Sequence, residues 1–315
     1  MVAAGRALGA READPAMRNP DSLAEKLLGP DELALIQEHP IGAALMDPPG
    51  AKPVYEALGT AALMLIRTKF IDEKLRQAIE GGARQYVILG AGFDTRAYRF
   101  QELLSDAKVF ELDSAATQAW KRRRAEAALG PAPANLTYVS IDFNHELLGE
   151  VLAKAGYNPA EKTFFTWEGV TMYVVEEGVR ATLRTVAQAA PGSRLVLDYT
   201  TQAVLDFMTK FPEYGPAKFL TKWGEPWVFG LPDGKEQAFF EDLGFEVCEK
   251  FPVFGPESIK RYLTRPDGTM LGAPPPDAPR PQLSPEAQNM ATVMSKSGSS
   301  FYSLIELAVQ EQGRA

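Results

Sequence analysis

A short apolar run followed by two closely spaced glycines constrains this chain more than any other stretch. Residues 86–89 have the length and β-branching of a strand that is buried on both faces. Gly90, Ala91 and Gly92 come next, and two glycines one residue apart allow a sharp turn and a close approach of a ligand to the backbone. A helix is expected over residues 94–104 because polar residues follow at once. Strand, glycine turn and helix make the first half of a nucleotide-binding βαβ unit.

A second apolar strand with an acidic end narrows the kind of ligand. The strand is expected at residues 108–112, and Asp113 follows it. An acidic side chain about 20 residues after the glycine turn accepts hydrogen bonds from ribose hydroxyls in Rossmann-like folds; Glu111 is the alternative. A dinucleotide motif would need a glycine where this chain has Thr95, and no P-loop lysine pattern occurs. The pattern favours a nucleoside-type cofactor without a pyrophosphate, with S-adenosylmethionine (SAM) as the main candidate.

Three motifs, in this order, resemble the leucine carboxyl methyltransferase-like family of SAM-dependent methyltransferases. They are LGAGFDTRAYR from Leu89, FELDSAATQAWK from Phe110 and WEGVTMYV from Trp167, and the resemblance extends over residues 55–310. The family includes protein phosphatase carboxyl methyltransferases and bacterial O-methyltransferases of secondary metabolism. The resemblance implies an α/β fold of the Rossmann-like class I methyltransferase type, with a seven-stranded mixed sheet and helices on both faces. It also implies SAM as cofactor and S-adenosylhomocysteine as product.

The rest of the chain is expected to form one methyltransferase domain over residues 1–315. Its parts are a helical N-terminal cap (1–80), the SAM-binding core (81–199), a lid insertion (200–235) and the C-terminal strands of the core (236–315). Beyond the elements above, helices are expected at 27–38, 54–80, 117–129, 176–189 and 236–243, and strands at 136–141, 163–167, 194–198, 245–251 and 301–309. We expect residues 1–20 to be mobile and the proline-rich residues 264–285 to be an irregular loop.

The resemblance also implies roles for residues around the strand ends. Arg67 matches the arginine that pairs with the methionine carboxylate of SAM; the alternative is an exposed helical arginine. Asp142 and Phe143 match an acidic–apolar pair beside adenine; Asp142 or Asn144 could cap the next helix instead of this role or in addition to it. Glu168 matches an acidic residue that contacts the methionine portion of SAM.

The sequence says less about the residues that bind the methyl acceptor than about those that bind the cofactor. Tyr173 could line the acceptor site or belong to the core. The insertion after residue 200 is rich in aromatic residues, among them Phe207, Trp223 and Trp227. Such rings suit a hydrophobic or aromatic small-molecule acceptor, or they pack the lid onto the body of the domain.

Composition excludes several other classes of function. The net charge of −8 and a pI of about 5.1 argue against a nucleic-acid partner, so we interpret the basic run at residues 121–124 as a solvated helix face. Cys248 is the only cysteine, which excludes an internal disulfide and fits a reducing cytoplasm. No apolar run approaches the roughly 18 residues of a membrane span, and no secretory pattern opens the chain. A cytoplasmic protein without membrane partners is expected, and no oligomeric state is assigned.

The chemistry of methyl transfer needs few protein groups. The sulfonium is already activated, so the protein mainly aligns the reactants in a dry site, and no catalytic residue or metal site is assigned. The chain has only two histidines, His39 and His145. A hydroxyl acceptor is usually helped by a base, whereas a carboxylate is already ionised at neutral pH. We interpret His145 as a surface or capping residue.

The resemblance, together with the scarcity of histidines, implies a SAM-dependent O-methyltransferase. The expected acceptor is a carboxylate or hydroxyl oxygen of a hydrophobic small molecule, of the polyketide type made in secondary metabolism. The alternatives are a protein C-terminal carboxyl methyltransferase and a SAM-binding module without turnover.

Overall fold

A seven-stranded sheet forms the centre of the computed structural model, which describes residues 1–38, 55–212, 226–271, 284–296 and 302–310. The strand order is β3-β2-β1-β4-β5-β7-β6. The first five strands run parallel, and β7 is antiparallel to both of its neighbours. The bounds are β1 (Gln85–Leu89), β2 (Lys108–Asp113), β3 (Leu136–Ser140), β4 (Thr163–Trp167), β5 (Arg194–Tyr199), β6 (Phe245–Pro252) and β7 (Ser303–Val309). The expected Rossmann-like methyltransferase fold is confirmed.

The central strands are buried on both faces, which explains their continuous apolar sequences. Every residue of β1 and β4 is buried. Because side chains alternate along a strand, Val87 and Leu89 join one apolar core, and Tyr86 and Ile88 join the other. The strand order reverses between β1 and β4, and open α/β sheets bind ligands outside the carboxyl ends of the strands at such a point.

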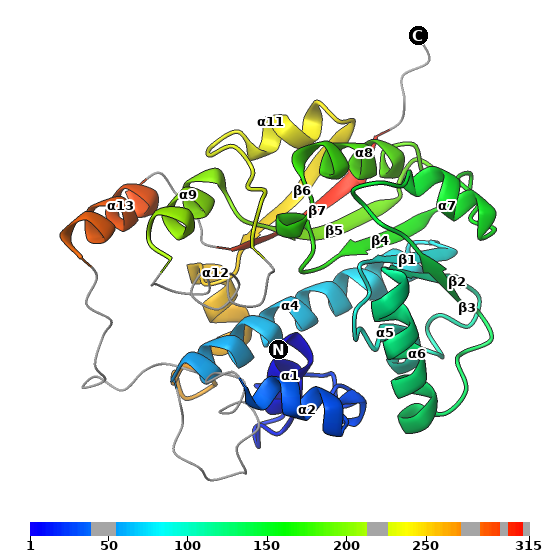
Figure 1. Cartoon of the computed structure of the whole chain (residues 1–315), viewed down its shortest axis with the longest axis horizontal. Coiled ribbons are helices and arrows are strands. Elements are labelled where there is room, and N and C mark those ends of the chain that lie inside the picture. Colours follow the sequence, from blue (N-terminus) through cyan, green and yellow to red (C-terminus); the bar gives the residue numbers. More distant parts are fainter. Residues whose placement is uncertain (39–54, 213–225, 272–283, 297–301, 311–315) are drawn as a thin grey trace.

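Helices cover the two faces of the sheet (Figure 1). One face carries α7 (Leu148–Lys154), α8 (Glu176–Val186) and α11 (Glu236–Glu241). The other carries the long α4 (Tyr55–Glu80), α5 (Arg96–Arg99), α6 (Ala115–Leu129), α12 (Pro256–Ser258) and the π-helical turn η3 (Ile259–Leu263). Helix α5 is much shorter than the helix expected over residues 94–104.

The N-terminal cap contains more structure than the sequence suggested. Helix α1 (Val2–Ala10) packs against α4, and Ala3, Ala4 and Ala7 are buried in a small core of their own. The turn η1 (Glu25–Leu27) and helix α2 (Pro30–Gln37) follow. The expectation that residues 1–20 are mobile was therefore wrong: their small side chains let α1 lie close against α4, where a Cβ on Gly5 would meet Met64 at 2.8 Å.

The insertion after β5 begins with helix α9 (Gln202–Lys210). Phe211 and Phe229 are buried, so part of its aromatic content is ordinary packing. Residues 213–225, with Trp223, lie outside the described residues, as does His39. Helix α13 (Pro285–Lys296) follows the proline-rich segment and has no counterpart in our expectations.

One ion pair corrects the interpretation of the basic run on α6. Lys121 is buried and its Nζ lies 2.5 Å from Oε2 of Glu111 on β2. Arg124 is half-buried, 3.4 Å from Glu32 of α2. Arg122 and Arg123 are exposed. The run is thus a solvated face in part only, because the inner side of the helix faces buried carboxylates.

Docking of α1 depends on a buried ion pair, which gives a first prediction. Arg6 is 6% exposed, its Nε lies 2.7 Å from Asp21, and its Nη2 donates to the backbone oxygen of Phe93 at 2.6 Å. Removing one partner of a buried pair costs about 3–5 kcal/mol. Arg6→Ala should therefore lower the free energy of unfolding, measured by urea titration, by about that amount.

Arg11→Ala is the matched control on the same segment. Arg11 pairs with Glu25 at the same 2.7 Å, but the two side chains are 25% and 51% exposed. Exposed pairs contribute about 1 kcal/mol or less. Equal small losses in the two variants would contradict the anchoring role of Arg6.

Candidate active site

A cleft of about 1420 Å³ lies at the carboxyl ends of β1 to β4. Residues that directly follow each of these four strands line it, so the sheet itself sets the floor of the site. All eight predicted cofactor residues are among the lining residues: Arg67, Gly90, Ala91, Gly92, Asp113, Asp142, Phe143 and Glu168.

The glycine turn has two separate physical reasons for its glycines. Gly90 has φ 67°, and a Cβ there would lie 2.2 Å from Cγ2 of Val170. Gly90 thus lets the loop after β4 pack against the end of β1. Gly92 has φ 45°, and a Cβ there would meet no atom within 4 Å. The backbone at Gly92 is therefore open to the cleft, as an approaching ligand requires.

Asp113 lies at the end of β2 and already holds the glycine turn. Its Oδ2 accepts the backbone N–H of Gly92 at 2.6 Å, and its Oδ1 accepts that of Ser114 at 2.7 Å. Each carboxylate oxygen retains a further lone pair for a ligand hydroxyl. Glu111, the alternative ribose residue, does not line the cleft. Burial raises the pKa of Glu111 to about 7, although the positive charge of Lys121 acts to lower that pKa.

Asp142 and Phe143 lie at the end of β3. Asp142 is exposed, and its carboxylate accepts the backbone N–H of Asn144 at 2.9 Å and lies 2.8 Å from Nδ1 of His145. The capping alternative is wrong for the helix that follows, because α7 starts after Leu147 and has no side-chain cap. The ring of Phe143 packs 5.7 Å from that of Trp167.

Arg67 and Glu168 form the most buried charged pair in the cleft. Nη2 of Arg67 lies 2.9 Å from Oε1 of Glu168, and Nη1 of Arg96 lies 2.8 Å from Oε2. Arg67 is 4% exposed, so the alternative of an exposed helical arginine is wrong. Burial would raise the pKa of Glu168, but the charges of Arg67 and Arg96 outweigh it and hold that pKa well below its usual range. The cleft thus offers a cation and an anion side by side.

The predicted acceptor residues are only partly brought together. Tyr173, in the turn η2 (Thr171–Tyr173), lines the cleft. Phe207 and Trp227 are not among its lining residues: Phe207 packs on Phe211 with ring centres 5.1 Å apart, and Trp227 packs against the apolar cores. The insertion reaches the cleft instead through Pro226 and Val228.

The sequence led us to expect that helices before residue 80 cover the cleft, but it singled out none of the residues before Arg67 that line it. The added lining residues of this region are Met1, Val2, Ala3, Arg6, Leu28, Glu32, Leu35, Ile36 and Glu38. The run VAAGRALGA places small apolar residues at helical spacing around one arginine, a signal that could have indicated a packed helix there.

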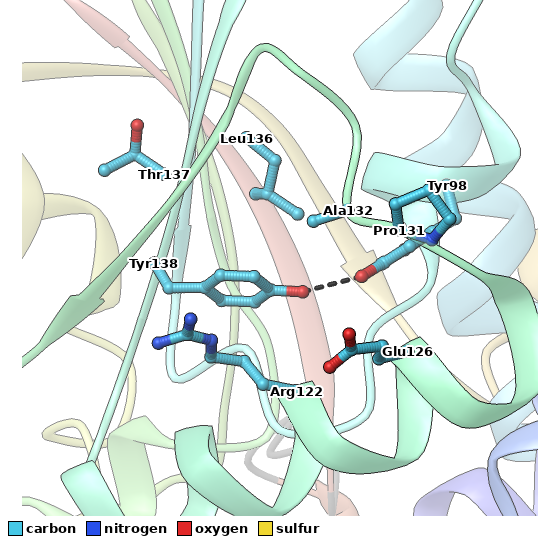
Figure 2. A pocket seen from close by; sticks show the side chains of 8 residues that line it. All are labelled: Tyr98, Arg122, Glu126, Pro131, Ala132, Leu136, Thr137 and Tyr138. Carbon is cyan, nitrogen blue, oxygen red and sulfur yellow. Dashed lines mark hydrogen bonds between the residues drawn. The ribbon is translucent and has the colours of Figure 1, made fainter.

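A second, smaller hollow of about 480 Å³ lies between α5, α6 and β3 (Figure 2). The hydroxyls of Tyr98 and Tyr138 point at each other, 2.6 Å apart, and the guanidinium of Arg122 lies 5.2 Å from the centre of the Tyr138 ring. No predicted site residue lines this hollow, and none of its lining atoms is a buried polar group without a partner. The larger cleft is therefore the candidate active site.

The described ranges also bear on metal binding and on membrane insertion. Within them, no group of three or more His, Cys, Asp or Glu residues could hold a metal ion. The helices of the same ranges include none with the length and apolar character to cross a membrane.

Comparison with known proteins identifies the family of the chain. Residues 1–187 match the family described as leucine carboxyl methyltransferase, a span that includes the cap and ends short of the expected residue 310. A candidate SAM-dependent methyltransferase of Frankia alni is 32% identical over 78% of this chain and 80% of its own length. One from a Parafrankia species is 31% identical over 73% of this chain and 72% of its own.

A solved structure supports the fold. A candidate methyltransferase from Thermobifida fusca aligns over 99% of this chain and 95% of its own, with a TM-score of 0.50 and 15% identity. The family match covers more than half of the sequence and includes the glycine turn, the acidic end of β2 and the motif after β4. This chain belongs to the leucine carboxyl methyltransferase family and is a SAM-dependent methyltransferase.

Proposed function

We propose that this enzyme transfers the methyl group of SAM to an oxygen of a hydrophobic small molecule, either a carboxylate or a hydroxyl of a polyketide-type metabolite. The observation that carries the proposal is the composition of the larger cleft. Charged and polar groups at the strand ends line it together with apolar side chains of the cap and of the segments after β4 and β5, among them Leu35, Ile36, Val170, Val174 and Val228. Ligand sites commonly measure about 300–1,000 Å³, so this volume suits a cofactor and an acceptor together.

The proposed orientation of SAM follows from the charges in the cleft. Its methionine end is a zwitterion, which complements the adjacent guanidinium of Arg67 and carboxylate of Glu168. Asp113, beside the open backbone of Gly92, is proposed to accept the ribose hydroxyls. Asp142 and Phe143 are proposed to border adenine.

The protein's part in the reaction is alignment and exclusion of water. SAM supplies an electrophilic methyl carbon: as the acceptor oxygen bonds to it, the carbon–sulfur bond breaks and its electrons remain on sulfur, giving S-adenosylhomocysteine. Tyr173, at the loop after β4, is proposed to border the acceptor. Aligning two bound reactants and drying the site are the main accelerations that such a displacement needs.

The histidines favour a carboxylate over a hydroxyl acceptor. No histidine is among the described residues that line the cleft. His145 is exposed and hydrogen-bonded to Asp142. A carboxylate titrates near pH 4 and needs no base at neutral pH, whereas a phenol titrates near pH 10.

A second candidate acceptor is the C-terminal carboxylate of a protein. The observation in its favour is the family match, since the family is described by the carboxyl methylation of leucine. Both candidates share the chemistry of a carboxylate oxygen, and they differ in the size of the group that must enter the cleft.

The ribose assignment predicts a loss of cofactor affinity in one variant. Asp113→Ala should weaken SAM binding by about 1–3 kcal/mol, because the ribose loses its acceptor and the glycine turn loses its anchor. Isothermal titration without acceptor measures this directly. Glu126→Ala, an exposed change on α6 beside the smaller hollow, is the control. Unchanged affinity in Asp113→Ala would overturn the ribose assignment.

The acceptor assignment predicts both the product linkage and the pH dependence. Methyl-labelled SAM would be incubated with hydrophobic carboxylic acids, with their alcohol and phenol counterparts, and with a leucine-ended peptide. We expect labelled esters that mild alkali cleaves, and a rate without a basic limb between about pH 6 and 9, since a carboxyl group is ionised throughout that range.

His39→Ala and His145→Ala test the same point from the protein side, and both should retain the parent's pH profile. An alkali-stable product, or a large rate loss in either variant, would indicate base-assisted transfer to a hydroxyl instead. Turnover of the peptide alone would favour the protein acceptor.

A further inference from the structure

We infer that Tyr302 and Asp198 are positioning residues for the SAM site, although neither lines the cleft. Asp198 lies in β5, and Tyr302 directly precedes β7. Both are buried, with exposed fractions of 0% and 6%. The inference rests on the proposed placement of the methionine end of SAM beside Arg67 and Glu168.

Asp198 fixes the turn that follows β4. Its two carboxylate oxygens accept the backbone N–H of Gly169 at 2.7 and 2.9 Å. Its backbone oxygen accepts the hydroxyl of Thr171 at 2.7 Å. Gly169 has φ 72° and directly follows Glu168. Asp198 thus holds both ends of the turn from which Glu168 faces the cleft.

The same carboxylate helps to fix the guanidinium of Arg67. Nε of Arg67 lies 3.4 Å from Oδ2 of Asp198, and its guanidinium carbon lies 5.5 Å from the centre of the Tyr302 ring. Glu168 holds the guanidinium from the cleft side at 2.9 Å. An arginine fixed by three groups loses less conformational entropy when a ligand carboxylate binds to it.

The hydroxyl of Tyr302 completes this arrangement. It donates to Oδ2 of Asp198 at 2.5 Å. Burial raises the pKa of Asp198, and Arg67 and the Tyr302 hydroxyl oppose that rise. Removing the hydroxyl therefore removes a hydrogen bond that stabilises the ionised form of Asp198. This carboxylate holds both Arg67 and the backbone of Gly169. The C-terminal part of the sheet, beyond the matched residues 1–187, is in this way coupled to the cofactor site.

Tyr302→Phe tests this role because it keeps the ring over Arg67 and removes only the hydroxyl. We expect its Kd for SAM, titrated without acceptor, to rise about tenfold. Asp198→Asn keeps the shape of the side chain, removes its charge, and should weaken SAM at least as much. Tyr262→Phe is the matched control: Tyr262 is 2% exposed, and its hydroxyl donates to Glu73 of α4 at 3.0 Å and not to Asp198.

Melting temperatures separate positioning from plain stability. Tyr302→Phe and Tyr262→Phe should lose similar thermal stability, but only Tyr302→Phe should lose SAM affinity. Equal SAM affinity in these two variants and the parent, while Arg67→Ala abolishes binding, would overturn the positioning role and leave the placement of SAM intact. Unchanged SAM affinity in Arg67→Ala would instead overturn the placement of SAM, and the inference with it.

Discussion

A buried network of arginines and carboxylates beneath the cleft is the interaction on which the rest of the structure depends. At its centre, Arg96 contacts three carboxylates: Asp72 at 2.7 Å, Asp94 at 2.5 Å and Glu168 at 2.8 Å. Glu168 in turn pairs with Arg67. Burying each ion alone would cost several kcal/mol, and close pairing with hydrogen bonds offsets that cost. The network therefore joins α4, the end of β1 and the end of β4 into one rigid floor.

The same network ties the N-terminal cap to the floor. Asp21 of the cap pairs with Arg6 at 2.7 Å, lies 3.5 Å from Arg99, and accepts the hydroxyl of Thr95 at 2.6 Å. Arg99 then contacts Asp72 at 2.8 Å. Residues of the cap and of the strand ends line the same cleft, and these contacts join the two regions.

The sequence predicted the sheet and the strand-end residues that line the cleft, because strands such as β1 are short apolar runs followed by a recognisable turn. The sequence did not predict features that depend on partners far away in the chain. Arg6 lies in a segment of small residues, and its burial requires Asp21 and the loop after β1. Lys121 looked like part of a solvated run, but its partner Glu111 lies in a strand. Phe207 and Trp227 suggested a ligand site, whereas in the structure they pack partly against neighbouring side chains. An aromatic-rich sequence does not distinguish residues that bind a ligand from residues that pack the fold.

The most direct test of the account compares two ligands on two proteins by calorimetry. S-adenosylhomocysteine carries the amino-acid end that Arg67 and Glu168 are proposed to bind, and methylthioadenosine lacks it. We expect the parent to bind S-adenosylhomocysteine about tenfold more tightly or better. Glu168→Gln should lose most of that preference and still bind methylthioadenosine like the parent. An equal loss for both ligands, or an unchanged preference, would contradict the proposal that this buried ion pair holds the amino-acid end of the cofactor.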